Sequence, residues 1–227
     1  MIKHIALIPD GNRRWATANG LPSVQGHKYA VETILPQLYD TLLELGISYC
    51  TFWAMSPDNF KKRSSFEVNN LFGLLFHFFE AQLKDFKEKN IRVKIIGNLE
   101  ELPEKVQQHL QRAMEETKHN TRMTFIIAMN YGGRDEVIRG VKKLMESGIS
   151  SKEVTNEKLN SVLDTADIPD PDIIIRTGGD QRTSGFLLWQ SEYTEYFFLD
   201  KFFPEFTPED LKNCIQEYEN RQRRFGK

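Results

Sequence analysis

The sequence has few cysteines, no long apolar run and little net charge, and each shortage excludes a class of protein. Only Cys50 and Cys214 are cysteines among 227 residues, too few for a disulfide framework or a cysteine zinc site. The first apolar run ends at Pro9, too early for the core of a signal peptide. No stretch approaches 18 consecutive apolar residues, so no segment is predicted to span a membrane. We expect a cytoplasmic protein.

The charges nearly cancel, because 30 Lys and Arg face 32 Asp and Glu for a net charge of −2. Such a chain has no general basic field, so binding to nucleic acid is not expected. Any site for an anion must therefore be built locally. The hydrophobic share of 40% and the charged share of 27% are typical of a globular protein.

Short apolar runs alternate with longer helical patterns along the whole chain. We predict strands at residues 4–9, 49–54, 92–96, 123–129 and 172–175. We predict helices at residues 26–45, 66–89, 103–119, 134–146, 156–162 and 208–223, with Pro36 disturbing the first of them. This alternation favours one α/β domain over residues 1–227, with a mostly parallel central sheet flanked by helices. Ligands of such sheets bind beyond the carboxyl ends of the strands.

The segment 66–86 is apolar almost all round, whereas a surface helix needs only one apolar stripe. Two interpretations stay open. The helix is buried in the core or at a dimer interface, or one side of it lines an apolar cavity for a long hydrophobic ligand.

Two clusters of anion-binding side chains each follow an apolar strand. In the first, Asp10 precedes a Gly-Asn turn and the pair Arg13 and Arg14; a carboxylate there suits Mg²⁺ and the arginines suit phosphate. In the second, Arg176 and Arg182 flank a Gly-Gly pair and are followed by hydroxyl side chains. Taken alone, the first cluster is best interpreted as an Asp-Gly turn with solvated arginines. Two such loops together favour a pair of diphosphate sites.

Four weaker signals accompany these clusters. Residues 54–63 directly follow another predicted strand. His27 lies at the start of a predicted helix, where its ring would face an anion bound at the helix N-terminus. The segment 130–134 contains a Gly-Gly pair and is best interpreted as a tight strand-to-helix turn. Glu195 lies among aromatic residues, either at the edge of the core or as an acid for metal or substrate.

These motifs, in this order, resemble the cis-prenyltransferase family, which includes undecaprenyl and dehydrodolichyl diphosphate synthases. The resemblance rests on HIALIPDGNRRWA, GHK, TFWAMSPDNFKKR, MNYGGRDE and PDIIIRTGGDQRTSGFLLWQSEYTEYFF, and spans essentially the whole chain. It implies a homodimer with an elongated hydrophobic tunnel. It also implies Mg²⁺-dependent condensation of isopentenyl diphosphate with an allylic diphosphate such as farnesyl diphosphate. The product is a longer Z-polyprenyl diphosphate, whose release could use transient contact with a membrane.

The resemblance also assigns roles to individual residues. Asp10 matches the catalytic, Mg²⁺-binding aspartate, Glu195 a second metal-binding acid, and Asn59 the residue assigned to proton removal. Residues matching the allylic diphosphate pocket and its surroundings are Gly11, Asn12, Arg13, Arg14, Trp15 and His27. Those near the reacting carbons are Ser56, Pro57, Asp58, Phe60 and Arg63. Those of the isopentenyl diphosphate pocket are Arg176, Arg182, Thr183 and Ser184.

The C-terminal Arg224-Phe225-Gly226 resembles the family element that reaches the partner's active site. Ser23 stands where the family commonly has an arginine, and Asp180 replaces a more usual glutamate. An extra lysine leaves Arg63 as the better match for one substrate contact, with Lys62 as the alternative. None of these departures removes the principal site residues, so we expect an active enzyme.

An apolar tunnel would hold the growing chain and limit its length. We predict that it is lined by Ala54, Leu71, Leu74, Leu75, Phe78 and Met123. Two other functions stay open at this point: a non-catalytic lipid-binding or scaffold subunit of a heteromeric prenyltransferase, and a Mg²⁺-dependent phosphohydrolase. A phosphohydrolase normally needs a second aspartate at the same strand end, and Ile8 occupies that position.

Overall fold

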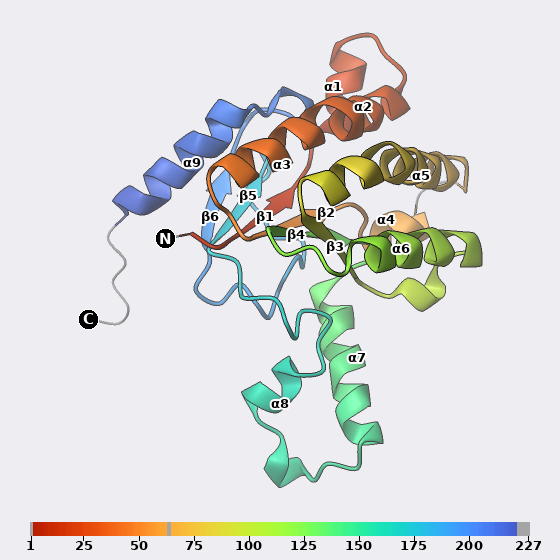
Figure 1. Cartoon of the computed structure of the whole chain (residues 1–227), viewed down its shortest axis with the longest axis vertical. Coiled ribbons are helices and arrows are strands. Elements are labelled where there is room, and N and C mark those ends of the chain that lie inside the picture. Colours follow the sequence, from red (N-terminus) through yellow and green to blue (C-terminus); the bar gives the residue numbers. More distant parts are fainter. Residues whose placement is uncertain (1, 63–64, 222–227) are drawn as a thin grey trace.

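A single sheet of six parallel strands organises the chain (Figure 1). The computed structural model describes residues 2–62 and 65–221. The strand order is β3-β4-β2-β1-β5-β6. The strands are β1 (His4–Ile8), β2 (Tyr49–Trp53), β3 (Ile91–Ile96), β4 (Met123–Ala128), β5 (Ile173–Arg176) and β6 (Glu195–Phe198). The predicted α/β fold with a parallel sheet is confirmed.

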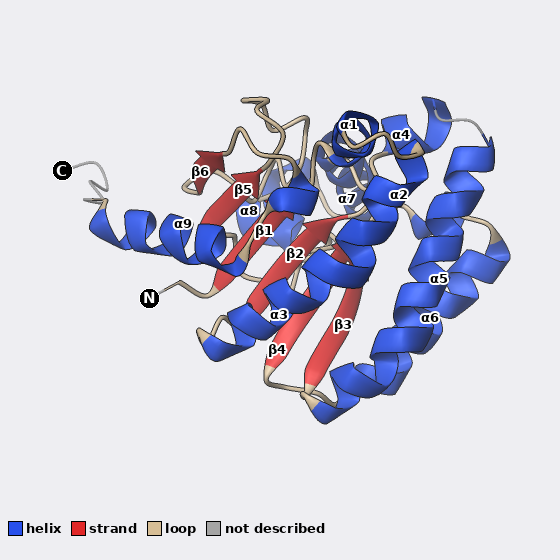
Figure 2. Ribbon diagram, turned by 90° about the horizontal axis from the view of Figure 1, so that it is seen from above, coloured by secondary structure: helices blue, strands red, loops and turns tan. Residues whose placement is uncertain are grey.

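Helices cover both faces of the sheet, and Figures 1 and 2 show α7 and α8 on the side opposite α3, α5 and α9. The α-helices are α1 (Asn12–Ala18), α2 (Ser23–Tyr29), α3 (Leu35–Glu44), α4 (Pro57–Lys62), α5 (Ser65–Glu88), α6 (Glu104–Thr117), α7 (Gly133–Glu146), α8 (Asn156–Asn160) and α9 (Pro208–Asn220). The 3₁₀ turns are η2 (Leu99–Glu101), η3 (Ser151–Glu153) and η4 (Phe203–Glu205). Thr207 caps α9 by accepting a hydrogen bond from the Asp210 N–H at 3.2 Å, as its sequence predicts.

The predicted helix over 26–45 is broken into three parts. Between α2 and α3 lies a π-helical turn, η1 (Ala30–Ile34), which ends just before Pro36. Proline has no N–H to donate and its ring crowds the preceding turn, so the expected disturbance at this position is confirmed. Widened π-helical turns frequently occur at functional sites, and this one faces the cavity described below.

The sheet is buried on both faces, with alternate residues of each strand entering different clusters. On β1, Ile5 and Leu7 enter the cluster beneath α3, α5 and α9, whereas Ala6 and Ile8 enter the opposite one. This explains why the strand is continuously apolar.

Cys50 and Cys214 are buried, free thiols, and burial raises the pKa of Cys50 to about 12.

Candidate active site

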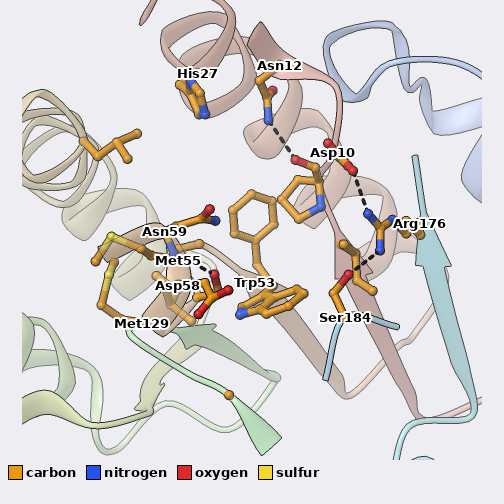
Figure 3. A pocket seen from close by; sticks show the side chains of 18 of the residues that line it. Asp10, Asn12, His27, Trp53, Met55, Asp58, Asn59, Met129, Arg176 and Ser184 are labelled. Carbon is orange, nitrogen blue, oxygen red and sulfur yellow. Dashed lines mark hydrogen bonds and ion pairs between the residues drawn. The ribbon is translucent and has the colours of Figure 1, made fainter. Parts of the chain in front are cut away.

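Loops that follow four of the strands line one cavity of 1090 Å³ at the carboxyl edge of the sheet (Figure 3). They follow β1, β2, β4 and β5, and they carry the motifs singled out in the sequence. Parallel strands bring their carboxyl ends to the same edge, which is why residues far apart in the chain meet here. The residues predicted for the site that line this cavity are Asp10, Gly11, Asn12, Arg13, Arg14, His27, Ser56, Pro57, Asp58, Asn59, Arg176, Arg182, Thr183 and Ser184.

The Asp10 carboxylate joins the first two clusters directly. Its Oδ2 accepts a hydrogen bond from Nη2 of Arg176 at 2.8 Å. Its Oδ1 accepts from the Gly11 N–H at 2.6 Å and from Nη2 of Arg14 at 3.2 Å. The loop after β1 and the loop after β5, 166 residues apart in the chain, therefore form one charged surface.

Hydrogen bonding keeps Asp10 ionised. Its partial burial alone would raise the pKa of the carboxyl group. Hydrogen bonds from Arg176 and the Gly11 N–H, with the charges of Arg176 and Arg14, outweigh burial and lower that pKa below its usual value. A carboxyl group with a lowered pKa loses its charge only at a pH below the normal range, so Asp10 is an anion at neutral pH.

Two glycines allow the first loop to close on its neighbours. Gly11 has φ +97°, and a Cβ there would lie 2.5 Å from Cδ1 of Phe202. A Cβ on Gly26 of α2 would lie 1.9 Å from the carbonyl oxygen of Asn12. Helix α2 can therefore pack directly on the loop, which brings His27 to the cavity wall.

Arg176 organises the second loop from within. Its side chain is only 5% exposed, and its Nη1 donates to the Ser184 hydroxyl at 2.9 Å and to the Arg182 carbonyl. Arg182 in turn forms a two-point ion pair with Asp180 at 2.8 and 2.9 Å. Asp180 also lies 3.6 Å from Nη2 of Arg14, so both clusters share this second carboxylate.

The third loop, after β2, supplies Ser56 and Asn59. The Ser56 hydroxyl accepts a hydrogen bond from the Asn59 N–H at 3.1 Å and thereby caps α4. The Tyr131 N–H donates to the Met55 carbonyl at 3.0 Å, which ties this loop to the turn after β4. Asn59 and Asp58 lie beside Met55 and Trp53 in Figure 3.

The inner part of the cavity is apolar and is enclosed by α5, η1, α3 and the strands beneath them. Of the residues predicted for this lining, the structure places Ala54, Leu71, Leu74, Leu75 and Phe78 there. The prediction for Met123 is wrong. Met123 begins β4, whereas the lining residues Ile127 and Met129 lie at the opposite end of that strand, next to the loops.

Three other predicted site residues lie away from the cavity lining. Trp15 stacks on Tyr29 with ring centroids 5.1 Å apart, and Phe60 packs on Phe72 with centroids 6.3 Å apart. Glu195 begins β6 and forms an ion pair with Arg221. Arg63 and the segment 224–226 lie outside the described residues, and the side chain of Lys62 is not described.

Glu195, which the resemblance assigns to metal binding, lies at the other end of the strands from Asp10. Glu195 is paired in register with Ile173 at the amino end of β5, while Asp10 lies beyond Ile8, which pairs with Arg176 at the carboxyl end. Within one chain the two carboxylates are therefore at opposite edges of the sheet.

Sequence reasoning missed Arg134 and Asp135, which also line the cavity. The sequence favours interpreting the Gly-Gly pair before them as a strand-to-helix turn without a role in binding. It is indeed a strand-to-helix turn, and it begins α7, but the Gly133 N–H also donates to the Gly185 carbonyl at 2.8 Å. That bond holds the turn against the loop after β5. Arg134, which directly follows the two glycines in the sequence, was the signal that could have identified this segment as part of the site.

The donor set around Asp10 fits Mg²⁺ bound partly by a substrate. No group of three or more His, Cys, Asp or Glu side chains suited to a metal occurs among the residues that the structure describes. Mg²⁺ is commonly held by one or two carboxylates together with phosphate oxygens and waters. Asp10 is ionised and partly exposed, and the buried Oδ1 of Asn12, two residues further on, has no hydrogen-bond partner. These oxygens suit such an ion.

The fold and the site together define an α/β protein with two arginine-containing loops at the mouth of an apolar cavity. Comparison with known proteins is more specific. Residues 8–226 match the family model described as "Putative undecaprenyl diphosphate synthase". The chain belongs to this family, the cis-prenyltransferases, and it is an isoprenyl transferase.

Two curated relatives are similar to this chain over nearly its full length. The ditrans,polycis-undecaprenyl-diphosphate synthase ((2E,6E)-farnesyl-diphosphate specific) of Micrococcus luteus is 42% identical over 99% of this chain and 91% of its own length. The isoprenyl transferase of Clostridium perfringens is 42% identical over 100% of this chain and 90% of its own length.

Two crystal structures share the fold. Lavandulyl diphosphate synthase from Lavandula x intermedia, in complex with dimethylallyl diphosphate, superposes with a TM-score of 0.94 at 32% identity, covering 100% of this chain and 98% of its own. A "probable undecaprenyl diphosphate synthase" from Campylobacter jejuni has a TM-score of 0.83 at 33% identity, covering 100% of this chain and 99% of its own.

Among the described residues, no helix combines the length and apolarity that crossing a bilayer requires.

Proposed function

We propose that this chain elongates an allylic diphosphate, with farnesyl diphosphate as starter, by successive additions of isopentenyl diphosphate to a Z-polyprenyl diphosphate. The observation that carries the proposal is the Asp10–Arg176 contact, which joins two arginine-rich loops at the mouth of a large apolar cavity. The loop after β1, with Arg13 and Arg14 at the start of α1 and His27 of α2, holds the allylic diphosphate. The loop after β5, with Arg176, Arg182 and Ser184, holds isopentenyl diphosphate.

The reaction joins C1 of the allylic substrate to C4 of isopentenyl diphosphate. The allylic C–O bond breaks, the isopentenyl double bond supplies the new C–C bond, and a proton leaves C2 of the isopentenyl unit. Arginines fixed around the leaving diphosphate offset its developing charge, which is the main catalytic requirement. Asp10 holds Arg14 and Arg176 in position and keeps the two diphosphates adjacent.

Proton removal requires a base near the new bond. Asn59 lies in the cavity wall after β2, the neighbour of β1 in the sheet, with its backbone N–H bound by Ser56. An amide is a weak base, so Asn59 orients the substrate, and a diphosphate oxygen accepts the proton. Replacing Asn59 by alanine without loss of rate would contradict this assignment.

Mg²⁺ completes the site, with Asp10 as its protein ligand and Asn12 as a further oxygen donor. When bound, the ion supplies positive charge that stabilises the departing diphosphate. Asp10 presents an ionised carboxylate for this purpose at neutral pH.

Labelled isopentenyl diphosphate, supplied with allylic starters of several lengths, tests the proposal in the purified chain. Chromatography should show products longer than the starter by several five-carbon units. A scaffold subunit would incorporate no label, and a phosphohydrolase would release phosphate without forming a carbon–carbon bond. Both outcomes would contradict the proposal.

Replacing Phe78 by alanine should give longer products. Phe78 lies deepest along α5 among the lining residues and is only 4% exposed, so its ring shortens the space for the chain. Each methylene that enters an apolar cavity is stabilised by about 0.8 kcal/mol, which favours filling the added space. Chromatography of the products gives the length, and an unchanged distribution would show that Phe78 does not limit it.

The chain also forms a homodimer in this proposal. Helix α7 exposes Ile138, Val141 and Met145 at spacings that place them on one face, with Met145 73% exposed. A contiguous apolar surface of this kind is typical of an interface. It adjoins the active site, because the same helix begins at the cavity.

Replacing Met145 by glutamate should shift the protein towards the monomer, because a charge would be buried against the partner. Sedimentation velocity measures this shift. Phe66→Glu is the matched control, since Phe66 is 76% exposed on α5 and should leave the oligomeric state unchanged. A Met145→Glu protein that sediments as the parent does would place the interface elsewhere.

A further inference from the structure

The apolar part of the cavity ends at the same level on the two helices that enclose it. Leu35 is the last lining residue of α3, and Phe78 is the last of α5. One helical turn further on each helix, on the same face, lie Tyr39 and Gln82. These two side chains are joined, because the Tyr39 hydroxyl lies 2.5 Å from Oε1 of Gln82.

An aromatic ring fills the space beyond this level. Phe86 is fully buried, and its ring centroid lies 5.4 Å from that of Tyr39, 5.8 Å from Phe78 and 6.1 Å from Phe125. Phe125 precedes the lining residue Ile127 by two positions on β4, so it occupies the same face of the sheet. The floor of the cavity is thus closed by rings from α3, α5 and β4.

A polar group outside the cavity holds these rings in place. The Tyr39 hydroxyl is shared between Gln82 and Oδ2 of Asp85, which is 2.8 Å away. Nζ of Lys89 lies 2.9 Å from Asp85 and 5.1 Å from the centre of the Tyr39 ring. Burial, then the hydrogen bond to Asp85, raise the pKa of Tyr39, so its hydroxyl remains a donor.

We propose that Phe86, which packs behind Phe78, is the final stop for the growing hydrocarbon chain and that the Tyr39 hydroxyl locks this stop by tying α3 to α5. The inference rests on the proposed function, because it needs a chain that grows into the cavity. Without the hydroxyl, the polar link between α3 and α5 at this level is reduced to Lys89, which bridges Asp85 and Asp40, and the Phe86 ring can turn aside as the chain arrives. Tyr39 is a positioning residue that touches no substrate.

The test is the length of the products made by Tyr39→Phe, which keeps the ring and removes only the hydroxyl. The most abundant product should lengthen by at least one five-carbon unit relative to the parent. Phe86→Leu, which retains an apolar side chain of smaller size, should lengthen it in the same way. Thermal unfolding of each variant confirms that it is folded when assayed.

Tyr218→Phe is the matched control. The Tyr218 hydroxyl donates to Asp172 at 3.2 Å from α9, a buried tyrosine–aspartate bond away from the cavity lining, so its loss should leave product length unchanged. Products of unchanged or shorter length from both Tyr39→Phe and Phe86→Leu would overturn the lock while leaving the proposed function intact. If the parent chain incorporates no isopentenyl diphosphate, the proposed function itself fails.

Discussion

Replacing Asp10 by asparagine should lower kcat at least about 10²–10³-fold, the range found when one preorganised charge-stabilising group is lost. The neutral amide cannot hold Arg14 and Arg176 by ion pairing, and it weakens the proposed magnesium site at the same time. Incorporation of labelled isopentenyl diphosphate at saturating substrate measures kcat. The melting temperature should change little, because the Asp10 side chain is 32% exposed at the cavity mouth.

Asp167→Asn provides the control for this variant. Asp167 also forms an ion pair, with Lys94, but it lies outside the cavity lining. Its replacement should leave kcat near that of the parent. An Asp10→Asn enzyme that retained more than a tenth of the parental kcat would remove Asp10 from the proposed role.

Replacing Arg176 by lysine should raise KM for isopentenyl diphosphate and lower kcat/KM about 10²-fold or more. The guanidinium contacts Asp10, Ser184 and the Arg182 carbonyl at once, and one ammonium group cannot reproduce this fork. Each hydrogen bond to a charged group contributes about 1.5–3 kcal/mol, and 1.36 kcal/mol corresponds to a factor of ten in rate.

The change should be selective between the two substrates. KM for the allylic diphosphate should move much less, because Arg13, Arg14 and His27 remain. Arg112→Lys, on the exposed surface of α6, controls for the substitution itself. Equal increases in both KM values for Arg176→Lys would contradict the division of the cavity into two diphosphate sites.

The sequence predicted most of the sheet, because buried parallel strands are continuously apolar and stand out from their surroundings. Five of the strands were placed to within a residue or two. β6 was missed because it is an edge strand that begins with Glu195 and is only partly buried, so it lacks that signal. Helices α1 and α4 were missed because both are short and overlap the polar motifs.

The sequence predicted which motifs share the cavity where a motif follows a strand end, since topology alone brings those ends together. The prediction of cavity residues was poor where the outcome depends on which end of a strand a residue occupies. Met123 begins β4 and Met129 directly follows its end, yet only Met129 reaches the cavity. Glu195 lies in a matching motif but near the amino ends of the strands, whereas Asp10 lies beyond their carboxyl ends. Tyr39 and Gln82, which meet across two helices, gave no sequence signal at all.

The most direct test of two adjacent diphosphate sites is a binding titration of the purified chain with Mg²⁺. Isopentenyl diphosphate is added to protein already saturated with farnesyl thiolodiphosphate, an unreactive allylic analogue, and calorimetry measures the stoichiometry. Two sites in one cavity predict one isopentenyl diphosphate bound per chain with the analogue still in place. Displacement of the analogue by isopentenyl diphosphate would show a single shared site and would contradict the arrangement around Asp10 and Arg176.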